Sequence, residues 1–288
     1  MIELSIIIPH FNDVVRLRRC LEALGSQMSA AVETIVVDNG SEMDLGPVAR
    51  DFTWAFFLTA AERGAGAARN AGVAASKGQR LAFLDCDCVP DADWVSYVLS
   101  MSGQDRVTGG RVATFDEGDA AFTSAQLFER VFAFDNARYI ADLGFSVTAN
   151  LVTTRAVFDA VGPFRTGVPE DMDWCARARI ASFRVVYDEK LCVKHPTRQD
   201  WAALCRKYRR VEIERFAIRD EGAIIWLARA FLTGISPLRD TFKVLKSSRL
   251  QGSGEKLKCL IALYRLRLKR MIWMVQFLLM AQRHPAKL

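Results

Sequence analysis

Short apolar runs that alternate with helix-like segments constrain the fold of this chain more than any other feature. Between these runs, apolar residues recur at helical spacing over residues 14–24, and residues 64–76 have the Ala content of a helix closed by a glycine. Strands that alternate with helices predict a mostly parallel sheet covered by helices on both faces. The four runs of strand length are residues 4–8, 33–37, 54–58 and 80–84.

Acidic residues follow two of these runs. Asp38 comes directly after the second run, and Asp85 and Asp87 follow the fourth. Ligands of parallel sheets bind beyond the carboxyl ends of the strands, so we expect both acidic groups at a nucleotide-binding edge. The chain contains neither the dinucleotide-binding motif GxGxxG after its first strand nor the P-loop motif GxxxxGK[ST]. We therefore expect a divalent cation to bridge the carboxylates and the diphosphate of a nucleotide. A cation would also relieve the desolvation cost of two acids at the end of a buried strand.

The length and the charge distribution of the chain indicate one large domain followed by a basic extension. Its 288 residues, 51% of them hydrophobic, suffice for one large α/β domain and an extension. Residues 1–200 carry 20 Lys and Arg against 27 Asp and Glu, whereas residues 201–288 carry 19 against 6. The basic end indicates an anionic partner, either lipid headgroups, nucleic acid or an acidic acceptor, or else a solvated helical face.

The first residues and the cysteines indicate a compartment. MIELSIIIPHFN lacks the basic region, long apolar run and cleavage site of a secretory signal, so we expect it to form a core strand. The seven cysteines are scattered and include no CxxC pair. We therefore expect reduced thiols in a cytoplasmic protein.

Five ordered segments resemble the inverting family 2 glycosyltransferases of the GT-A fold, and together they cover residues 3–196. Each segment alone is a weak signal, and their common order carries the resemblance. It implies an α/β fold with a GT-A-type, mostly parallel sheet and flanking helices, followed by a basic helical C-terminal extension. The segments are SIIIPHFN and VVDNGS, which resemble two nucleotide loops; ERGAGAARNAG, an Ala-Arg-Asn-x-Gly helix; FLDCDCVP, the DxD segment; and VPEDMDWCARA, the helix start that supplies a catalytic base.

The resemblance also implies a domain division. A GT-A-like catalytic domain would occupy residues 1–200, with a nucleotide-binding half at about 1–110 and an acceptor half at about 111–200. A basic amphipathic helical extension would occupy residues 201–288.

On the donor side, the resemblance implies a nucleotide-sugar held with Mn²⁺ or Mg²⁺. Asp87 would ligate the metal and His195 would lie beside it, while Asp38 would accept a hydrogen bond from the base or serve only as a turn residue. We favour a UDP-sugar, although Asn39, where the family often has a second Asp, leaves dTDP and GDP open. Arg63, Arg69 and Asn70 also fit an ordinary surface helix. The expected nucleotide-sugar contacts are Pro9, Asn12, Asp38, Arg63, Arg69, Asn70 and Asp85.

On the acceptor side, acids stand at a helix start, where the helix dipole favours them for structural reasons as well. The resemblance makes Asp171 the general base for an attacking hydroxyl, with inversion in one displacement. Residues 205–210, CRKYRR, lack the Gln-x-x-Arg-Trp pattern of processive synthases, so we expect transfer of a single sugar in cell-surface polysaccharide or glycolipid assembly. The acceptor would be a saccharide or lipid-linked, and its expected contacts are Glu170, Asp173 and Trp174.

The C-terminal residues have the pattern of a basic amphipathic helix. Its uncharged run, residues 271–282, is shorter than the roughly 20 residues that span a bilayer. Residues 256–283 are thus expected to contact an anionic membrane surface, which would make the protein peripheral on the inner face of the cell membrane, or to pack on the catalytic domain or in a homodimer. No nucleic acid partner is expected. The apolar stripe consists of Leu260, Ile261, Tyr264, Leu268, Met271, Val275 and Leu278.

Two other functions remain open at this point. Asp85-x-Asp87-x-Val89 also fits the DxDx[TV] nucleophile motif of haloacid-dehalogenase-like phosphatases, but that motif normally follows the first strand, whereas three candidate strands precede it here. Composition alone is also compatible with a non-catalytic nucleotide-sugar or membrane-binding module.

Overall fold

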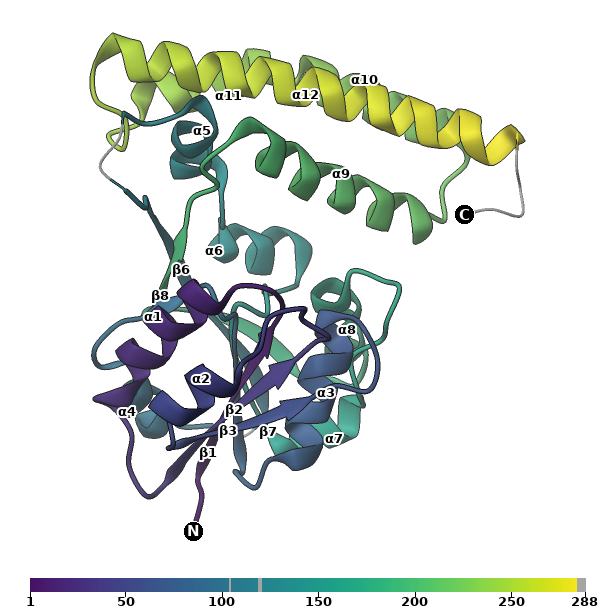
Figure 1. Ribbon diagram of the computed structural model, residues 1–288. Coiled ribbons are helices and arrows are strands. Elements are labelled where there is room, and N and C mark those ends of the chain that lie inside the picture. Colours follow the sequence, from purple (N-terminus) through teal and green to yellow (C-terminus); the bar gives the residue numbers. More distant parts are fainter. Residues whose placement is uncertain (104, 119–120, 284–288) are drawn as a thin grey trace. The chain divides into compact units, whose positions relative to one another are not determined.

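The computed structural model describes residues 1–103, 105–118 and 121–283, which contain an eight-stranded sheet of order β3-β2-β1-β4-β7-β6-β8-β5 (Figure 1). The first four strands of this order are mutually parallel. The ends of each strand lie within two residues of the ends of an apolar run in the sequence, and all but the edge strand β3 are largely buried. They are β1 (Leu4–His10), β2 (Val32–Asp38), β3 (Ala55–Thr59) and β4 (Arg80–Leu84).

The remaining strands add an antiparallel region to the sheet. β7 pairs antiparallel with β4 and with β6, and β5 pairs antiparallel with β8. The prediction of an α/β fold with a mostly parallel sheet, flanking helices and a basic helical C-terminal extension is confirmed, and the antiparallel pairings were not predicted. The strands are β5 (Val89–Pro90), β6 (Arg106–Phe115), β7 (Asn150–Thr154) and β8 (Arg184–Pro196).

Helices cover both faces of the sheet. Ile6 and Ile8 of β1 belong to the apolar cluster that contains α1 and α4, whereas Ile7 belongs to the cluster with α3, α7 and α8. Alternate side chains of a strand point to opposite faces, so these two clusters form two helical layers. Gly72 allows α3 to approach β1, because a Cβ there would lie 2.5 Å from Ile7 Cγ2. The helices are α1 (Val14–Gly25), α2 (Gly46–Asp51), α3 (Ala65–Ala75), α4 (Trp94–Ser100), α7 (Arg155–Val161) and α8 (Glu170–Ile180).

The chain forms two compact units. The first, residues 1–113 and 134–195, contains the sheet and its covering helices together with α6 (Asn136–Arg138) and the π-helix η1 (Tyr139–Leu143). The second comprises residues 114–133 and 196–288. Its helices are α5 (Ser124–Phe132), α9 (Trp201–Ala217), α10 (Ala223–Ile235), α11 (Pro237–Lys246) and α12 (Gly252–Arg283).

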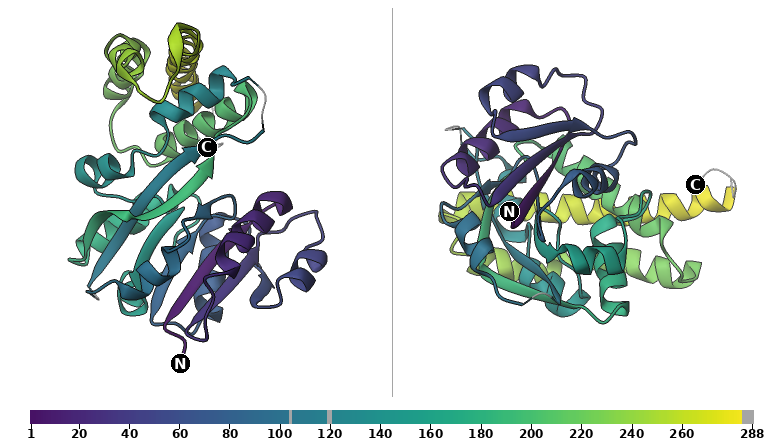
Figure 2. Two further views of the ribbon diagram at one scale, coloured as in Figure 1. Left: turned by 90° about the vertical axis from the view of Figure 1, so that its left-hand side faces the viewer. Right: turned by 90° about the horizontal axis from the view of Figure 1, so that it is seen from below.

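Within the second unit, α12 packs against α5 and α9 and also against α10 and α11 (Figure 2). Cys259, Leu263 and Leu266 form its buried face. The stripe expected from the sequence lies partly elsewhere, since Tyr264 and Leu268 are 44% and 51% exposed. The helix is apolar on more than one side, so periodicity alone does not choose the face that packs. None of the described helices has the length and apolar composition needed to cross a membrane.

Candidate functional site

The carboxyl ends of β1, β2 and β4 bring the predicted nucleotide-binding residues to one edge of the sheet. His10 and Asp38 are partners in the parallel register of β1 and β2. The pairing of β1 with β4 stops at Ile7, two residues before Pro9, which is buried in β1 and has no N–H to donate to a ladder. The segment with Asp85 follows β4 directly at the same edge.

Asp38 is held by a network that the sequence did not predict. His10 Nδ1 lies 3.3 Å from Asp38 Oδ1, and the backbone N–H of Ser41 donates to both carboxylate oxygens at 3.4 and 3.2 Å. His10 Nε2 accepts the N–H of Asp13 at 3.1 Å, so the proton of the neutral ring is on Nδ1, which faces Asp38. His10 is thus a donor that orients Asp38. The strand register that makes them neighbours cannot be read from the sequence.

The same hydrogen bonds keep Asp38 ionised, and Asn12 adds bonds that hold the neighbouring loops together. Burial raises the pKa of Asp38, but the hydrogen bonds from Ser41 and His10 outweigh it, so the pKa is lowered and Asp38 stays ionised. Asn12, with a positive φ of 51°, donates its N–H to Ser41 Oγ at 2.9 Å and accepts the N–H of Glu42 at 2.9 Å. Asn12 therefore joins the loop after β1 to the loop after β2.

The loop before α3 docks on the loop after β2. Asn39 Oδ1 accepts the N–H of Gly64 at 2.9 Å, a contact that a carboxylate oxygen would also make. Arg63 is exposed, and its side chain passes close to Gly40. The structure thus places Arg63 beside the loop that follows Asp38.

Arg69 connects acids from two distant segments. Its guanidinium is 3% exposed and donates to Asp85 Oδ1 at 2.7 Å and to Glu170 Oε1 at 3.1 Å. Burial lowers the pKa of Arg69, but Asp85 and Glu170 raise it by more, and Asp171 contributes in the same direction. The DxD segment and the start of α8 therefore meet at one buried guanidinium, which belongs to Arg69 of α3.

Asn70 fastens the loop before α8 to α3. Its side-chain amide donates to the carbonyl of Phe164 at 2.8 Å and accepts the N–H of the same residue at 2.8 Å. Both hydrogen-bonding groups of Asn70 are thus engaged by the backbone of Phe164. In this structure Asn70 braces the α8 segment, and a direct contact with a nucleotide stays a prediction.

Asp87 and His195 come together from the DxD segment and β8. His195 Nε2 lies 3.1 Å from Asp87 Oδ2, and the two side chains are 7% and 25% exposed. The imidazole packs on Phe134, with ring centroids 4.5 Å apart. This packing fixes the ring so that Nε2 faces the carboxylate.

This pair has the donor set of a divalent cation site. Among the described residues no group of three or more His, Cys, Asp or Glu side chains is arranged to hold a metal. Mg²⁺ in nucleotide sites is commonly bound by one or two carboxylates plus substrate phosphates and water, so Asp87 can supply the carboxylate and His195 a nitrogen donor beside it. Two ligands at right angles, each about 2.1 Å from an octahedral ion, lie about 3 Å apart. The 3.1 Å between His195 Nε2 and Asp87 Oδ2 fits that requirement.

The start of α8 presents its acids in different environments. Asp171 Oδ1 accepts the N–H of Met172 at 2.8 Å and lies close enough to Arg69 to raise its pKa. Asp173 forms ion pairs with Arg165 at 3.4 Å and Arg177 at 2.9 Å. Glu170 is thus the acid of α8 that pairs directly with Arg69, Asp171 lies near the same guanidinium, and Asp173 is tied to neighbouring arginines.

Trp174 is a core residue in this structure. It is fully buried, its Nε1 donates to the carbonyl of Gly162 at 2.9 Å, and its ring packs on Phe158 and Phe164. The expectation that Trp174 contacts an acceptor has no support in these contacts. An apolar residue at helical spacing is explained here by packing.

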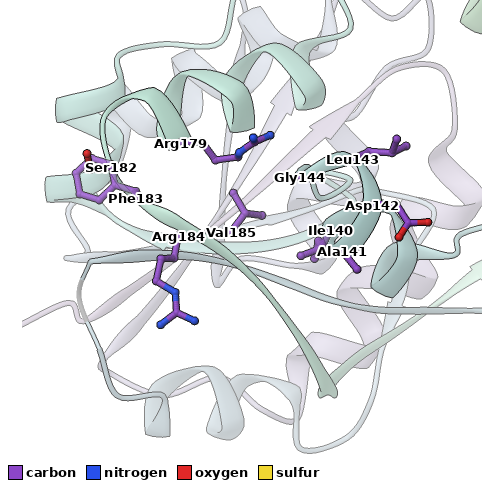
Figure 3. A pocket seen from close by; sticks show the side chains of 10 residues that line it. All are labelled: Ile140, Ala141, Asp142, Leu143, Gly144, Arg179, Ser182, Phe183, Arg184 and Val185. Carbon is purple, nitrogen blue, oxygen red and sulfur yellow. The ribbon is translucent and has the colours of Figure 1, made fainter.

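A cavity of about 670 Å³ lies elsewhere in the first unit (Figure 3). It is lined by η1, by the end of α8 with Arg179 and by the start of β8 with Arg184. None of the residues predicted to bind donor or acceptor lines it. We therefore do not assign it to the predicted chemistry.

Comparison with known sequences gives one family. A family model described as "Glycosyl transferase family 2" matches residues 5–162. Glycosyltransferase AglE of Haloferax volcanii is 29% identical over 248 residues, which are 79% of this chain and 81% of AglE. A pre-mycofactocin glycosyltransferase of Mycobacterium tuberculosis is 27% identical over 221 residues, 70% of this chain and 45% of the relative.

Solved structures share the fold at low identity. The mannosyltransferase PcManGT from Pyrobaculum calidifontis, solved with GDP-Man and Mn²⁺, superposes with a TM-score of 0.58 at 16% identity, covering 95% of this chain and 85% of PcManGT. S. aureus TarS, solved with UDP-GlcNAc, gives 0.54 at 14% identity and covers 99% and 92%.

Proposed function

The chain belongs to glycosyl transferase family 2, and on that premise we propose that it transfers a single sugar from a nucleotide-sugar donor to an acceptor hydroxyl with inversion. The observation that carries the proposal is the double ion pair of Arg69 with Asp85 and Glu170. It ties the acids of the DxD segment to those at the start of α8, as a displacement between donor and acceptor requires. The phosphatase alternative for Asp85-x-Asp87 loses its basis, because the family match covers this segment.

The donor would lie at the carboxyl ends of the parallel strands. Asp38, kept ionised and oriented by His10 and Ser41, would accept the N–H of a pyrimidine base. Arg63 is exposed beside that loop and would reach the diphosphate. Asp85 would contact the ribose or a metal-bound water. UDP remains our first choice, and the fold neighbours, one with GDP-Man and one with UDP-GlcNAc, support the nucleotide-sugar class.

Asp87 and His195 would hold Mn²⁺ or Mg²⁺. Their facing donor atoms, 3.1 Å apart, support this assignment, as does the Mn²⁺ bound in PcManGT. When bound, the cation neutralises charge that develops on the departing diphosphate. Phe134 and the end of β8 would keep the imidazole in the orientation that ligation needs.

Asp171 would act as the general base. It would take the proton of the acceptor hydroxyl as that oxygen forms a bond to the anomeric carbon and the bond to the diphosphate breaks on the opposite face. One such displacement inverts the anomeric centre without a covalent sugar-enzyme intermediate. The position of Asp171 near Arg69, and so near Asp85, supports this role. Glu170 and Asp173 would border the acceptor.

The acceptor would be a saccharide or a lipid-linked hydroxyl compound in cell-surface polysaccharide or glycolipid assembly. Residues 1–200 would form the catalytic domain, of which residues 114–133 and 196–200 pack in the second unit. Residues 201–288 would form the helical extension, whose excess of positive charge favours a cytoplasmic enzyme peripheral to the inner face of the cell membrane. Dimerisation through residues 256–283 is the alternative use of this extension.

The experiment that tests the proposal is a thermal-shift panel of nucleotide-sugars, each with and without Mn²⁺ or Mg²⁺. A true donor stabilises the folded state by an amount that grows with the logarithm of its concentration over Kd, roughly 2.7 kcal/mol at a hundred times Kd. We expect one donor class to raise the melting temperature only when the cation is present. A panel with no metal-dependent shift would contradict the proposal.

A further inference from the structure

Helices α10 and α11 carry an apolar stripe that runs continuously from one helix into the other. Ser236, which joins them, has helical backbone angles of φ −55° and ψ −26°, and its hydroxyl donates to the carbonyl of Thr233 at 2.8 Å. Side chains three or four residues apart lie on one face of a helix. The members of this α10–α11 stripe are Ile224, Phe231, Ile235, Leu238, Phe242 and Leu245.

The opposite face of the two helices packs on α12, alongside which they run (Figure 1). Trp226 Nε1 donates to the carbonyl of Met274 at 2.9 Å, and Arg267 donates to Asp240 Oδ2 at 3.2 Å. The inner face is therefore filled by contacts within the second unit, and the stripe lies outside them.

The stripe is strongly exposed. Ile224 is 84% exposed, Phe231 62% and Phe242 64%, whereas Trp226 on the inner face is 2% exposed. Single exposed apolar residues are ordinary, but a continuous row of six over two helices marks an interaction surface. A helix that is apolar on both faces normally has both of them covered.

The exposed charges along α11 are positive. Residues 223–249 contain five Lys and Arg and one acid, Asp240, which is 2% exposed. Arg239, Lys243 and Lys246 are exposed on α11, within a turn of the apolar residues. Arg239 also pairs with Asp240 at 3.2 Å, and Arg229 of α10 pairs with Glu221 at 2.9 Å. The stripe therefore has a positive border along α11, and Lys243 and Lys246 are its main cations.

This charge pattern distinguishes between two occupants. A second copy docked through the same face would place these cations against each other, which is unfavourable. An anionic bilayer presents phosphates to the cations and an apolar layer to the side chains between them, which is how interfacial amphipathic helices bind.

We propose that the α10–α11 stripe seats this protein on an anionic lipid bilayer, with its six apolar side chains in the boundary between headgroups and acyl chains and Arg239, Lys243 and Lys246 on lipid phosphates. The surface stands on residues of the second unit alone and is independent of which sugar is transferred. It also moves the main contact from residues 256–283 to α10 and α11, because α12 buries Cys259, Leu263 and Leu266.

Flotation of the full chain with vesicles tests this surface. Vesicles of phosphatidylcholine with phosphatidylglycerol should carry the protein, and phosphatidylcholine alone should carry much less. The double variant Phe231→Ser/Phe242→Ser should reduce partition to the anionic vesicles by roughly tenfold or more. The variant Lys243→Glu/Lys246→Glu should reduce it by roughly tenfold and should remove most of its dependence on salt.

Matched controls come from the first unit. Ile180 on α8 is 84% exposed, the same as Ile224, so Ile180→Ser should bind vesicles like the wild type while Ile224→Ser binds less. Lys190→Glu is the control for charge, and circular dichroism melting shows that each variant folds. Equal binding to both vesicle types, or full binding by Phe231→Ser/Phe242→Ser, would overturn the proposal. A wild-type dimer that this variant dissociates, without vesicle binding, would identify a second copy as the occupant.

Discussion

His195 Nε2 at the end of β8 lies 3.1 Å from Oδ2 of Asp87, the second acid of the DxD segment. Asp87 lies between β4 and β5, and Val89 of β5 pairs with Lys194 of β8, the residue before His195. Their meeting is therefore a property of the folded sheet and supplies the two protein donors that the proposed cation needs.

Asp87→Ala should weaken metal-dependent binding of the donor. The substitution removes one of the two proposed ligands, so the affinity for nucleotide-sugar with Mn²⁺ should fall by roughly tenfold to a hundredfold. Isothermal titration calorimetry measures this directly. Asp91→Ala is the control, since Asp91 pairs with Lys194 at 3.0 Å in the same region. Equal affinities for the two variants would remove Asp87 from the metal site.

Arg69→Met should destabilise the fold. The buried guanidinium would no longer neutralise Asp85 and Glu170, and breaking such a pair costs about 3 kcal/mol. The free energy of unfolding in urea measures the loss. Arg165→Met removes an arginine that is 64% exposed and should cost less than about 0.5 kcal/mol. If both variants lose the same amount, Arg69 does not bridge the two segments.

His10→Leu and His10→Asn should differ in nucleotide binding. Leucine removes the donor to Asp38, whereas the amide nitrogen of asparagine can take the place of Nδ1. We expect roughly tenfold weaker nucleoside diphosphate binding for His10→Leu and partial or full recovery for His10→Asn. The measurement is the affinity for nucleoside diphosphate, compared at a temperature where both variants are fully folded. Equal losses in the two variants would show that the ring acts through packing alone.

Glu129→Gln should make the protein less stable at neutral pH and reduce its sensitivity to acid. Glu129 is 1% exposed and accepts from Arg198 at 2.7 Å and Lys207 at 3.1 Å. Burial raises the pKa of Glu129, but Lys207 and Arg198 lower it by more. Its contribution is thus fully present above the ordinary pKa of about 4.3 and is lost as the pH falls through the lower folded value.

We expect a loss of about 3 kcal/mol at pH 7 for Glu129→Gln. The difference from the wild type should shrink below about pH 4, as urea unfolding at several pH values would show. Glu189→Gln is the control, because Glu189 is 75% exposed. A difference that stays constant down to the lowest pH would contradict an ionised Glu129.

The sequence was sufficient for the parallel part of the sheet. Its strands are short apolar runs whose period and ends are local properties, as in β1 with Ile6 and Ile8 on one face and Ile7 on the other. The packing of residues 114–133 with the C-terminal helices could not be predicted from the sequence. It rests on contacts such as Phe128 with Tyr208, 5.9 Å between ring centroids, which no local pattern encodes.

The candidate site also contains residues that local sequence patterns predict and residues that they do not. Asp38, Asp85, Asp87 and the acids of α8 were located because strand ends and helix starts can be read from the sequence. The bonds of Asn70 to Phe164 and the burial of Trp174 depend on the loop before α8, whose geometry is set by packing. Sequence spacing therefore predicted where the acids lie and not which neighbouring polar or aromatic residues serve the core.

Asp171 is the proposed base opposite a metal-bound donor, and Asp171→Asn tests this role most directly. Donor binding with Mn²⁺ and release of nucleoside diphosphate are measured on the same preparation, with Asp159→Asn, an exposed acid on α7, as the control. We predict binding within about threefold of the wild type and release slowed by roughly a hundredfold to ten thousandfold. Release at the wild-type rate with Asp171→Asn would contradict the account.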